Sequence, residues 1–314
     1  MKNCKKCYVY IAMAGLIWSS LGLFGNILMA RGLSSEQVAF TRLFIGFITL
    51  SIYAGIRKPH VLKLNKKGLM YCVAIGIICQ GFFNMCYFKA VEVVGVSIAA
   101  VLLYTSPLFL AFFSKLIYKE RITRGKAVSL ILCVLGAIMA VTGGKFDVAG
   151  VSSYGILMGI LAAVTYALMP TISKNALKDF SSETLLIYGF LFGAIFMIPS
   201  AKPWEMVSFA TDINVMPFMM LLGIFPAALA YIFYAGGISL GAELSIVGVV
   251  ASIELVAASF IGWIFIGEPF SIGKLIGVAI MFVSAIAAVS ANDTTEEAVE
   301  TSKGGVYTGA LEEV

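Results

Sequence analysis

Ten long apolar segments restrict the folds that this chain can adopt. They cover residues 8–30, 38–56, 68–90, 95–117, 127–142, 152–173, 184–200, 215–239, 244–266 and 272–290. Most of them reach the roughly 20 residues that cross a bilayer as a helix, while the fifth and seventh are shorter. Backbone amides in hydrocarbon must be hydrogen bonded within a helix or a closed barrel. Because the segments lack the alternation of barrel strands, the sequence predicts an all-α integral membrane protein with ten transmembrane helices.

The composition and the distribution of charge agree with a membrane protein. Charged residues make up only 12% of the chain, whereas soluble domains carry roughly 25%. Sixteen lysines and arginines lie in the termini and one set of alternate loops, five lie in the opposite loops, and Arg42 lies within a span. Basic residues accumulate on the cytoplasmic side. We therefore expect a multi-pass protein of the cell membrane with both termini in the cytoplasm.

The basic loops also bear on the partners of the chain. Their charge is dispersed over short loops, so membrane lipids are the expected contact and nucleic acid is not. Residues 291–314 differ from the rest, with six acidic residues, one lysine and few large apolar side chains. This composition predicts a mobile acidic cytoplasmic tail.

An internal repeat divides the chain into halves. After a shift of 148 residues, residues 113–141 align with residues 261–289, and Glu120 meets Glu268. Five spans are thus repeated once, and because five is odd, the second copy starts on the opposite side of the membrane.

The expected units are a first five-helix repeat (1–148) and a second, inverted five-helix repeat (149–290). Inverted repeats are a recurrent plan of secondary transporters, which bind substrate near the midplane and alternate access to it. This architecture favours transport over catalysis.

Short motifs at the ends of the repeats resemble a known family. "KERIT" (119–123) closes the fourth span and "GEPF" (267–270) closes the ninth, while Trp18 lies in the first span and "SIELV" (252–256) in the ninth. Together with the repeat, these features resemble the EamA-type branch of the drug/metabolite transporter superfamily over residues 8–290.

One residue departs from the family pattern, in which proline often follows the glutamate of the ninth span. Leu255 stands there, and Pro107 occupies the matching position of the other repeat. The resemblance implies ten helices, no ATPase domain, and movement of small organic solutes such as amino acids, often outward.

Polar and aromatic side chains in the middle of spans are candidates for a substrate site, because burying them in lipid is costly. With inverted pseudo-symmetry, equivalent helices of the two repeats would bring them together. The predicted substrate-binding residues are Trp18, Gln80, Asn84, Tyr104, Ser106, Tyr166, Tyr231, Tyr234 and Glu254.

Glu254 is the only charged residue between 244 and 266. A charge at a helix centre costs about 2.5–3.5 kcal/mol on insertion scales, so a lipid-facing position is not expected. Two interpretations stay open. Glu254 is either a neutral acid that donates a hydrogen bond to a tyrosine or a free carbonyl, or a proton-exchanging carboxylate that also binds a substrate ammonium.

Aromatic rings and a carboxylate both attract cations, so the predicted site suits an amine-bearing solute. Amino acids or related amines, exported in exchange for protons, fit this chemistry. Organic or quaternary cations are the alternative substrates.

Other features have two interpretations each. Arg42 either snorkels to the outer surface or attracts anions in an outer vestibule. Pro107 and Pro226 either kink their spans or fit the packing. The patterns Gly155-x-x-x-Gly159, Gly189-x-x-x-Gly193 and Gly273-x-x-x-Gly277 either pack helices within the chain or form a homodimer face.

Other function classes find less support in the sequence. The single histidine, His60, lies in a cytoplasmic loop, and the aspartates lie outside the spans: Asp147, Asp179, Asp212 and Asp293. Cys4 and Cys7 lack a second pair or a nearby histidine to complete a metal site. A channel needs rings of carbonyls or charges, and a receptor does not explain the repeat. We expect a transporter that is not an enzyme and uses no cofactor or metal.

Overall fold

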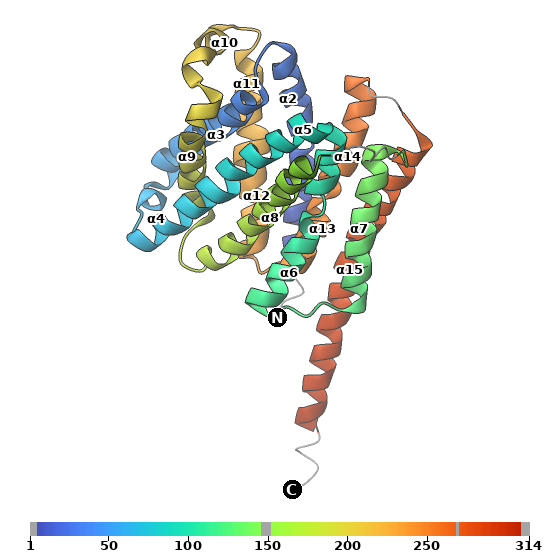
Figure 1. Cartoon of the computed structure of the whole chain (residues 1–314). Coiled ribbons are helices and arrows are strands. Elements are labelled where there is room, and N and C mark those ends of the chain that lie inside the picture. The colour runs from blue at the N-terminus through green and yellow to red at the C-terminus, as the bar shows by residue number, and fades with distance from the viewer. Residues whose placement is uncertain (1–4, 146–151, 268–269, 309–314) are drawn as a thin grey trace.

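The structure is a computed structural model that describes residues 5–145, 152–267 and 270–308, and in these ranges it contains helices and no strand (Figure 1). The first half consists of α1 (Lys5–Trp18), α2 (Ser20–Ala30), α3 (Ser35–Arg57), η1 (Pro59–Leu62), α4 (Lys66–Val73), η2 (Ala74–Phe82), α5 (Phe83–Leu103), α6 (Ser106–Tyr118) and α7 (Arg124–Thr142). The second half consists of α8 (Ser153–Ala176), α9 (Ser182–Ala201), η3 (Pro203–Met206), α10 (Val207–Thr211), α11 (Met216–Leu222), η4 (Gly223–Leu229), α12 (Ala230–Ser239), α13 (Leu244–Ala251), α14 (Ile253–Ile261), η5 (Gly262–Ile266) and α15 (Ile272–Thr308).

These helices account for the ten predicted spans. Nine helical stretches of the described chain have the length and hydropathy of a span, and α6 is a shorter apolar helix. The longest stretch, Lys66–Leu103, has 38 residues and would extend about 57 Å as one helix, nearly twice the hydrocarbon thickness. It therefore contains one complete crossing and the start of the next.

Gly95 separates the third span from the fourth. Its φ of 82° lies in the left-handed region, which glycine enters without a steric penalty. Val94 packs against Gly155 at the start of α8, and Leu102 packs against Gly159 one turn further along α8. The segment after Gly95 therefore runs back into the bundle beside α8.

The two halves share their helix irregularities. The π-helical segments η2 and η4 coincide within one residue after the 148-residue shift, and so do the α5–α6 and α13–α14 interruptions of the fourth and ninth spans. Interrupted spans and π-helical turns are frequent at functional sites. The repeat predicted from the sequence is thus also present in the backbone.

The three small-residue patterns serve packing within the chain. Gly155 and Gly159 face α5, Gly189 and Gly193 face η2, and Gly273 and Gly277 face α7. Such glycines allow close approach of helix backbones in a membrane. Because all three faces are occupied, a homodimer through them is not compatible with this fold, and self-association elsewhere stays a prediction.

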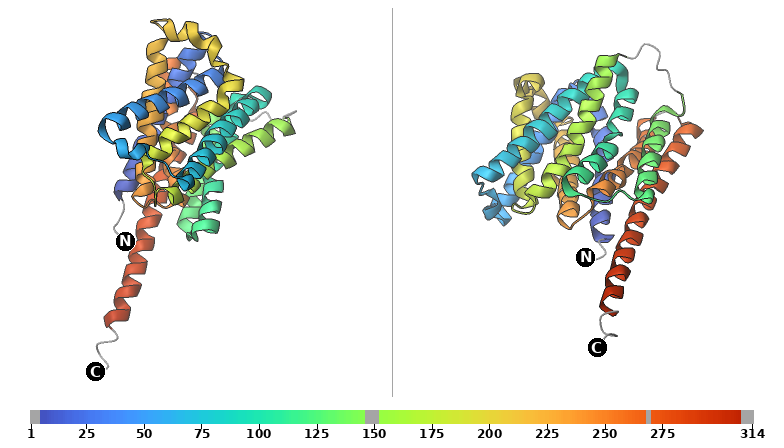
Figure 2. Two further views of the ribbon diagram at one scale, coloured as in Figure 1. Left: turned by 90° about the vertical axis from the view of Figure 1, so that its left-hand side faces the viewer. Right: turned by 60° about the horizontal axis from the view of Figure 1, so that its bottom comes forward.

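One end of the bundle carries the start of α1 and the connections α3–α4, α6–α7, α8–α9 and α12–α13 (Figures 1 and 2). We call it the basic end, because most lysines and arginines of the loops lie there. Gly125 lies beside Ala291, so α15 leaves the bundle at the same end.

The tail continues α15 as a helix to Thr308 (Figure 1), and its mobility stays a prediction. Cys4 of the C-x-x-C pair, Glu268 of "GEPF" and the last residues 309–314 lie outside the described ranges.

Candidate functional site

Three predicted residues form a buried aromatic cluster where α1, α9 and α12 meet. The ring of Trp18, the last residue of α1, lies 5.0 Å from Tyr231 and 4.9 Å from Tyr234, centroid to centroid. Tyr231 in turn lies 5.2 Å from Phe190 of α9. All four rings are buried, so the cluster sits inside the bundle and not on its lipid face.

Glu254 lies in the first turn of α14, next to α1. The ninth span is interrupted at Ser252, whose hydroxyl donates a 2.8 Å hydrogen bond to the carbonyl of Gly248. A Cβ on Gly15 of α1 would lie 2.8 Å from the Ala251 carbonyl and 3.3 Å from the Glu254 nitrogen. Only glycine allows this approach. It places Glu254 beside α1 at Gly15, less than one helical turn before Trp18.

The surroundings of Glu254 show which way it faces. Its carboxylate interacts electrostatically with the phenol groups of Tyr87, Tyr104 and Tyr166 and with the guanidinium of Arg42. These groups come from α3, α5, the residue after α5, and α8, so Glu254 faces the interior. The side chain is partly exposed and has no hydrogen-bond partner among the described residues. The interpretation of Glu254 as a hydrogen-bond donor therefore finds no acceptor in this structure.

Tyr166 lies between Glu254 and the aromatic cluster in the sense that it is close to Glu254 and also to Tyr104, Tyr231 and Tyr234. Six of the nine predicted residues thus come together in one region, which we call the central site: Trp18, Tyr104, Tyr166, Tyr231, Tyr234 and Glu254.

The other three predicted residues are buried outside this cluster. The amide of Asn84 donates a 2.6 Å hydrogen bond to the Gln80 carbonyl, and the Gln80 amide lies 3.7 Å from the Met169 sulfur. Gln80 Oε1 has no partner in the described part of the chain. Ser106 occupies in the first repeat the position that Glu254 occupies in the second. The described contacts do not join these three residues to the central site.

Tyr87 was not among the predicted site residues, and of the two interpretations of Arg42 the snorkelling one is wrong. Tyr87 follows Gln80 and Asn84 at helical spacing, i, i+4 and i+7, so this periodicity would have indicated it. Arg42 does not snorkel, because it is only 7% exposed and is flanked by the buried residues Thr41 and Leu43. Arg42 lies near the end of its span, so its depth did not decide between a snorkelling and an interior position.

The two mid-span prolines differ in their setting. Pro107 lies at a close crossing of α6 and α13, since a Cβ on Gly248 would lie 3.0 Å from its Cα, which supports the packing interpretation. Pro226 lies within the π-helical segment η4, where its missing amide donor coincides with the irregular backbone.

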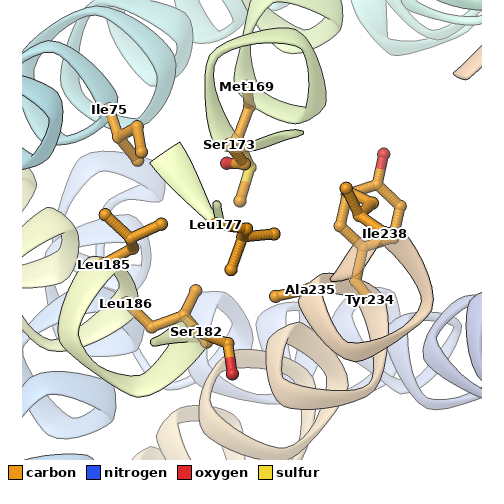
Figure 3. A pocket seen from close by; sticks show the side chains of 10 residues that line it. All are labelled: Ile75, Met169, Ser173, Leu177, Ser182, Leu185, Leu186, Tyr234, Ala235 and Ile238. Carbon is orange, nitrogen blue, oxygen red and sulfur yellow. The ribbon is translucent and has the colours of Figure 1, made fainter. Parts of the chain in front are cut away.

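A small cavity lies between the central site and the basic end (Figure 3). Ten residues line it, of which four are Tyr234, Met169, Leu177 and Leu186, and the other six have apolar or small side chains. Its volume of about 10 Å³ has room for about one water molecule and not for an organic solute. Among the described residues, no group of three or more His, Cys, Asp and Glu side chains is placed to hold a metal ion.

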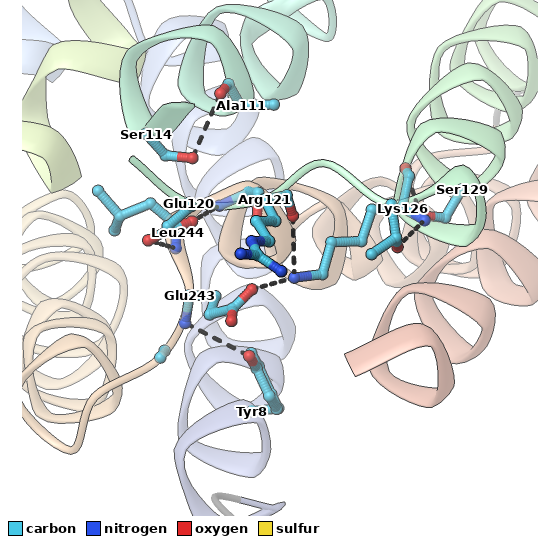
Figure 4. A network of polar contacts seen from close by, with 12 residues as sticks. Tyr8, Ala111, Ser114, Glu120, Arg121, Lys126, Ser129, Glu243 and Leu244 are labelled. Carbon is cyan, nitrogen blue, oxygen red and sulfur yellow. Dashed lines mark hydrogen bonds and ion pairs between the residues drawn. The ribbon is translucent and has the colours of Figure 1, made fainter. Parts of the chain in front are cut away.

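Glu120 binds the N-terminus of α13 at the basic end (Figure 4). Its carboxylate accepts hydrogen bonds from the Leu244 and Ser245 amides, both at 3.1 Å, and pairs with Lys174 at 2.7 Å. Burial raises the pKa of Glu120, but Lys174 and the two amides outweigh burial, and the pKa lies below its ordinary value. Glu120 is therefore ionised near neutral pH.

A second ion pair lies beside it (Figure 4). Lys126 is 1% exposed, and its ammonium pairs with Glu243. The amide of Glu243 also donates a 3.3 Å hydrogen bond to the hydroxyl of Tyr8. This network ties α1 and the α6–α7 connection to the start of α13.

Ion pairs between the two halves occur at the basic end. Four of them are described: Lys58–Glu183, Lys67–Asp179, Lys126–Glu243 and Glu120–Lys174. At the opposite end, the described ion pairs are local, Lys89–Glu92 and Lys202–Glu205, each three residues apart. Ion pairs thus join the halves at the basic end, whereas at the opposite end Arg31 joins them through the Asn214 carbonyl and the Phe218 ring.

The nine span-length helical stretches and the shorter α6 of the described chain, arranged in two related halves around a candidate polar and aromatic site, have the architecture of a membrane transporter. The chain belongs to the EamA-like transporter family, whose model matches residues 5–142 and 153–290, once in each half.

Relatives of this chain cover most of its length. An uncharacterized transporter of Clostridium kluyveri is 27% identical over 304 residues, which span 92% of this chain and 94% of the relative. The pseudopaline exporter CntI of Pseudomonas aeruginosa is 28% identical over 256 residues, which span 81% of this chain and 86% of the exporter. A solved crystal structure shares the fold, with a TM-score of 0.78, 18% identity and coverage of 90% of this chain and 96% of that one.

Proposed function

We propose that this protein is a secondary transporter that moves small organic metabolites by alternating access, without ATP. One observation carries the proposal: four ion pairs fasten the two halves at the basic end, and the ion pairs described at the opposite end are local. Rocking of the repeats would break these pairs and open that end. The small cavity behind Tyr234 supports a closed path there.

The chemistry of the central site supports an amine-bearing substrate. Glu254 offers a carboxylate without a hydrogen-bond partner among the described residues, and Trp18 and Tyr166 offer aromatic faces to a cation. Amino acids or related amines are the proposed class, and organic or quaternary cations are the alternative. A relative named as an exporter supports outward movement. A proton on Glu254 is the proposed coupling ion.

The proposed orientation puts the basic end in the cytoplasm of a cell-membrane protein, because basic residues accumulate there. Lys63 and Lys145 are both exposed. In a background without native cysteines, a cysteine at position 145 should react with an impermeant thiol reagent on intact cells, and one at position 63 only after permeabilisation. Labelling of position 63 and protection of position 145 on intact cells would reverse the orientation.

Glu120→Gln should open the basic end more often. The amide keeps the shape of the side chain but loses the charge-assisted bonds to Lys174 and the α13 amides, which are worth roughly 1.5–3 kcal/mol each. A reporter cysteine at Ser173, which lines the small cavity, should react at least about tenfold faster from the cytoplasmic side of inside-out vesicles.

The matched control is Glu205→Gln, which breaks only a local pair at the opposite end and should leave the rate unchanged. Equal reactivity of Ser173→Cys with and without Glu120→Gln would show that the contacts of Glu120 with Lys174 and α13 do not hold the basic end closed. Because the pKa of Glu120 lies below its ordinary value, its contribution is present above the ordinary carboxyl pKa and is lost as the pH falls through the lowered one.

A further inference from the structure

Arg42 is a buried cation without a counter-ion in contact. It is 7% exposed, and its Nη2 atom is fully buried and has no hydrogen-bond partner in the described chain. Burying a charge and a donor without partners is costly. A ligand with acceptor atoms would supply the missing partner, and a buried ionisable group within a span is a candidate for a functional site.

Arg42 also lies near the aromatic cluster. One turn along α3, a Cβ on Gly46 would lie 3.0 Å from the ring of Phe190, and Phe190 lies 5.2 Å from Tyr231. Glu254 approaches the cluster from α14, beside α1, which ends at Trp18. The cation and the carboxylate thus both come from helices that contact this set of rings.

The two opposite charges do not neutralise each other by contact. Arg42 interacts electrostatically with Glu254, yet among the described residues no carboxylate oxygen lies within 4.0 Å of its guanidinium. Both groups are left with unused hydrogen-bonding capacity in the same region of the bundle.

We propose that Arg42 and Glu254 hold the two ends of one zwitterionic substrate, so that the central site selects α-amino acids over amines without a carboxylate. Arg42 binds the carboxylate, since the planar guanidinium fork matches it with two parallel hydrogen bonds. Glu254 binds the ammonium, and the rings of Trp18 and Tyr166 cover the remainder of the molecule. This inference rests on the proposed function and names its substrate class.

The test compares ligands that differ only in the carboxylate. Thermal-shift titrations of the purified wild-type protein use a panel of L-amino acids, with the methyl ester and the decarboxylated amine of each. For at least one amino acid, we expect binding at least about tenfold tighter than that of its ester and its amine. An ester and amine that bind as tightly as the parent acid would overturn the inference without any mutant.

Arg42→Gln should remove this preference, so that the acid and its ester bind equally, and Arg42→Lys should retain part of it. Arg57→Gln, at the exposed end of the same helix, is the matched control and should keep the full preference. A folded Arg42→Gln protein with an unchanged preference would contradict the assignment of Arg42.

The same experiments separate this inference from the proposed function. Counterflow of amines that is indifferent to a carboxylate would overturn the role of Arg42 and leave the transporter function in place. Absence of both binding and counterflow for the whole panel would overturn the proposed function, and this inference with it.

Discussion

Glu254→Gln is expected to abolish proton-coupled net transport, or to weaken the binding of amine-bearing substrates at least about tenfold, while the protein stays folded. The amide has nearly the shape of the acid and cannot ionise. Glu254 has no hydrogen-bond partner among the described residues, so the substitution breaks no bond of the fold. The measurements are the melting temperature of the purified protein and uptake into liposomes with and without a pH gradient.

Glu92→Gln is the matched control for Glu254→Gln, because Glu92 is exposed and pairs only with Lys89, three residues away. It should leave both the melting temperature and transport unchanged. Normal rate, affinity and pH dependence in Glu254→Gln would show that the carboxylate is not part of the transport site. A large fall in melting temperature would instead assign it a structural role.

Gly277→Ala is expected to have the largest effect on stability. A Cβ at this position would lie 2.1 Å from the Ala140 nitrogen and 2.5 Å from the Met139 carbonyl carbon of α7. These are backbone atoms, so α7 and α15 must separate. Overpacking of this kind costs about 1–3 kcal/mol or more. We expect a lower melting temperature, measured by a thermal melt of the purified protein. We also expect poor accumulation in the membrane, measured with a fluorescent protein fused to the chain.

Gly55→Ala provides the control for Gly277→Ala, because no atom lies within 4 Å of a Cβ added there. Both substitutions gain the same helix propensity, of the order of 1 kcal/mol, so the difference between them reports the packing alone. If the two variants melt alike, α7 and α15 do not pack as closely as the structure has them.

The fold was largely predictable, because its signals are local. Apolar segments near 20 residues long mark the spans, and the 148-residue shift that aligns Glu120 with Glu268 marks the repeat. The boundary between the third and fourth spans was predicted as well, because the fourth apolar segment begins at Gly95. The structure adds the local geometry, in which Gly95 has a φ of 82° and Val94 and Leu102 on either side of it pack against α8.

The candidate site was predictable in part. Residue type and depth pointed to Trp18, Tyr166 and Glu254, since polar groups at mid-span are costly anywhere but in the interior. The burial of Arg42 and the partners of Glu120 were not predictable. Both depend on which helix faces meet, and residues as far apart as Glu120 and Ser245 are brought together only by the tertiary packing.

Counterflow in proteoliposomes tests transport by alternating access most directly. The purified protein is reconstituted into liposomes loaded with an unlabelled mixture of amino acids, without nucleotide, and the same amino acids are added outside in labelled form, one at a time. We expect at least one label to accumulate transiently above its equilibrium level and to saturate with concentration, and Glu254→Gln to alter that accumulation. Linear flux that never saturates and comes with single-channel currents, or the absence of accumulation for amino acids and amines alike, would contradict a carrier of this kind.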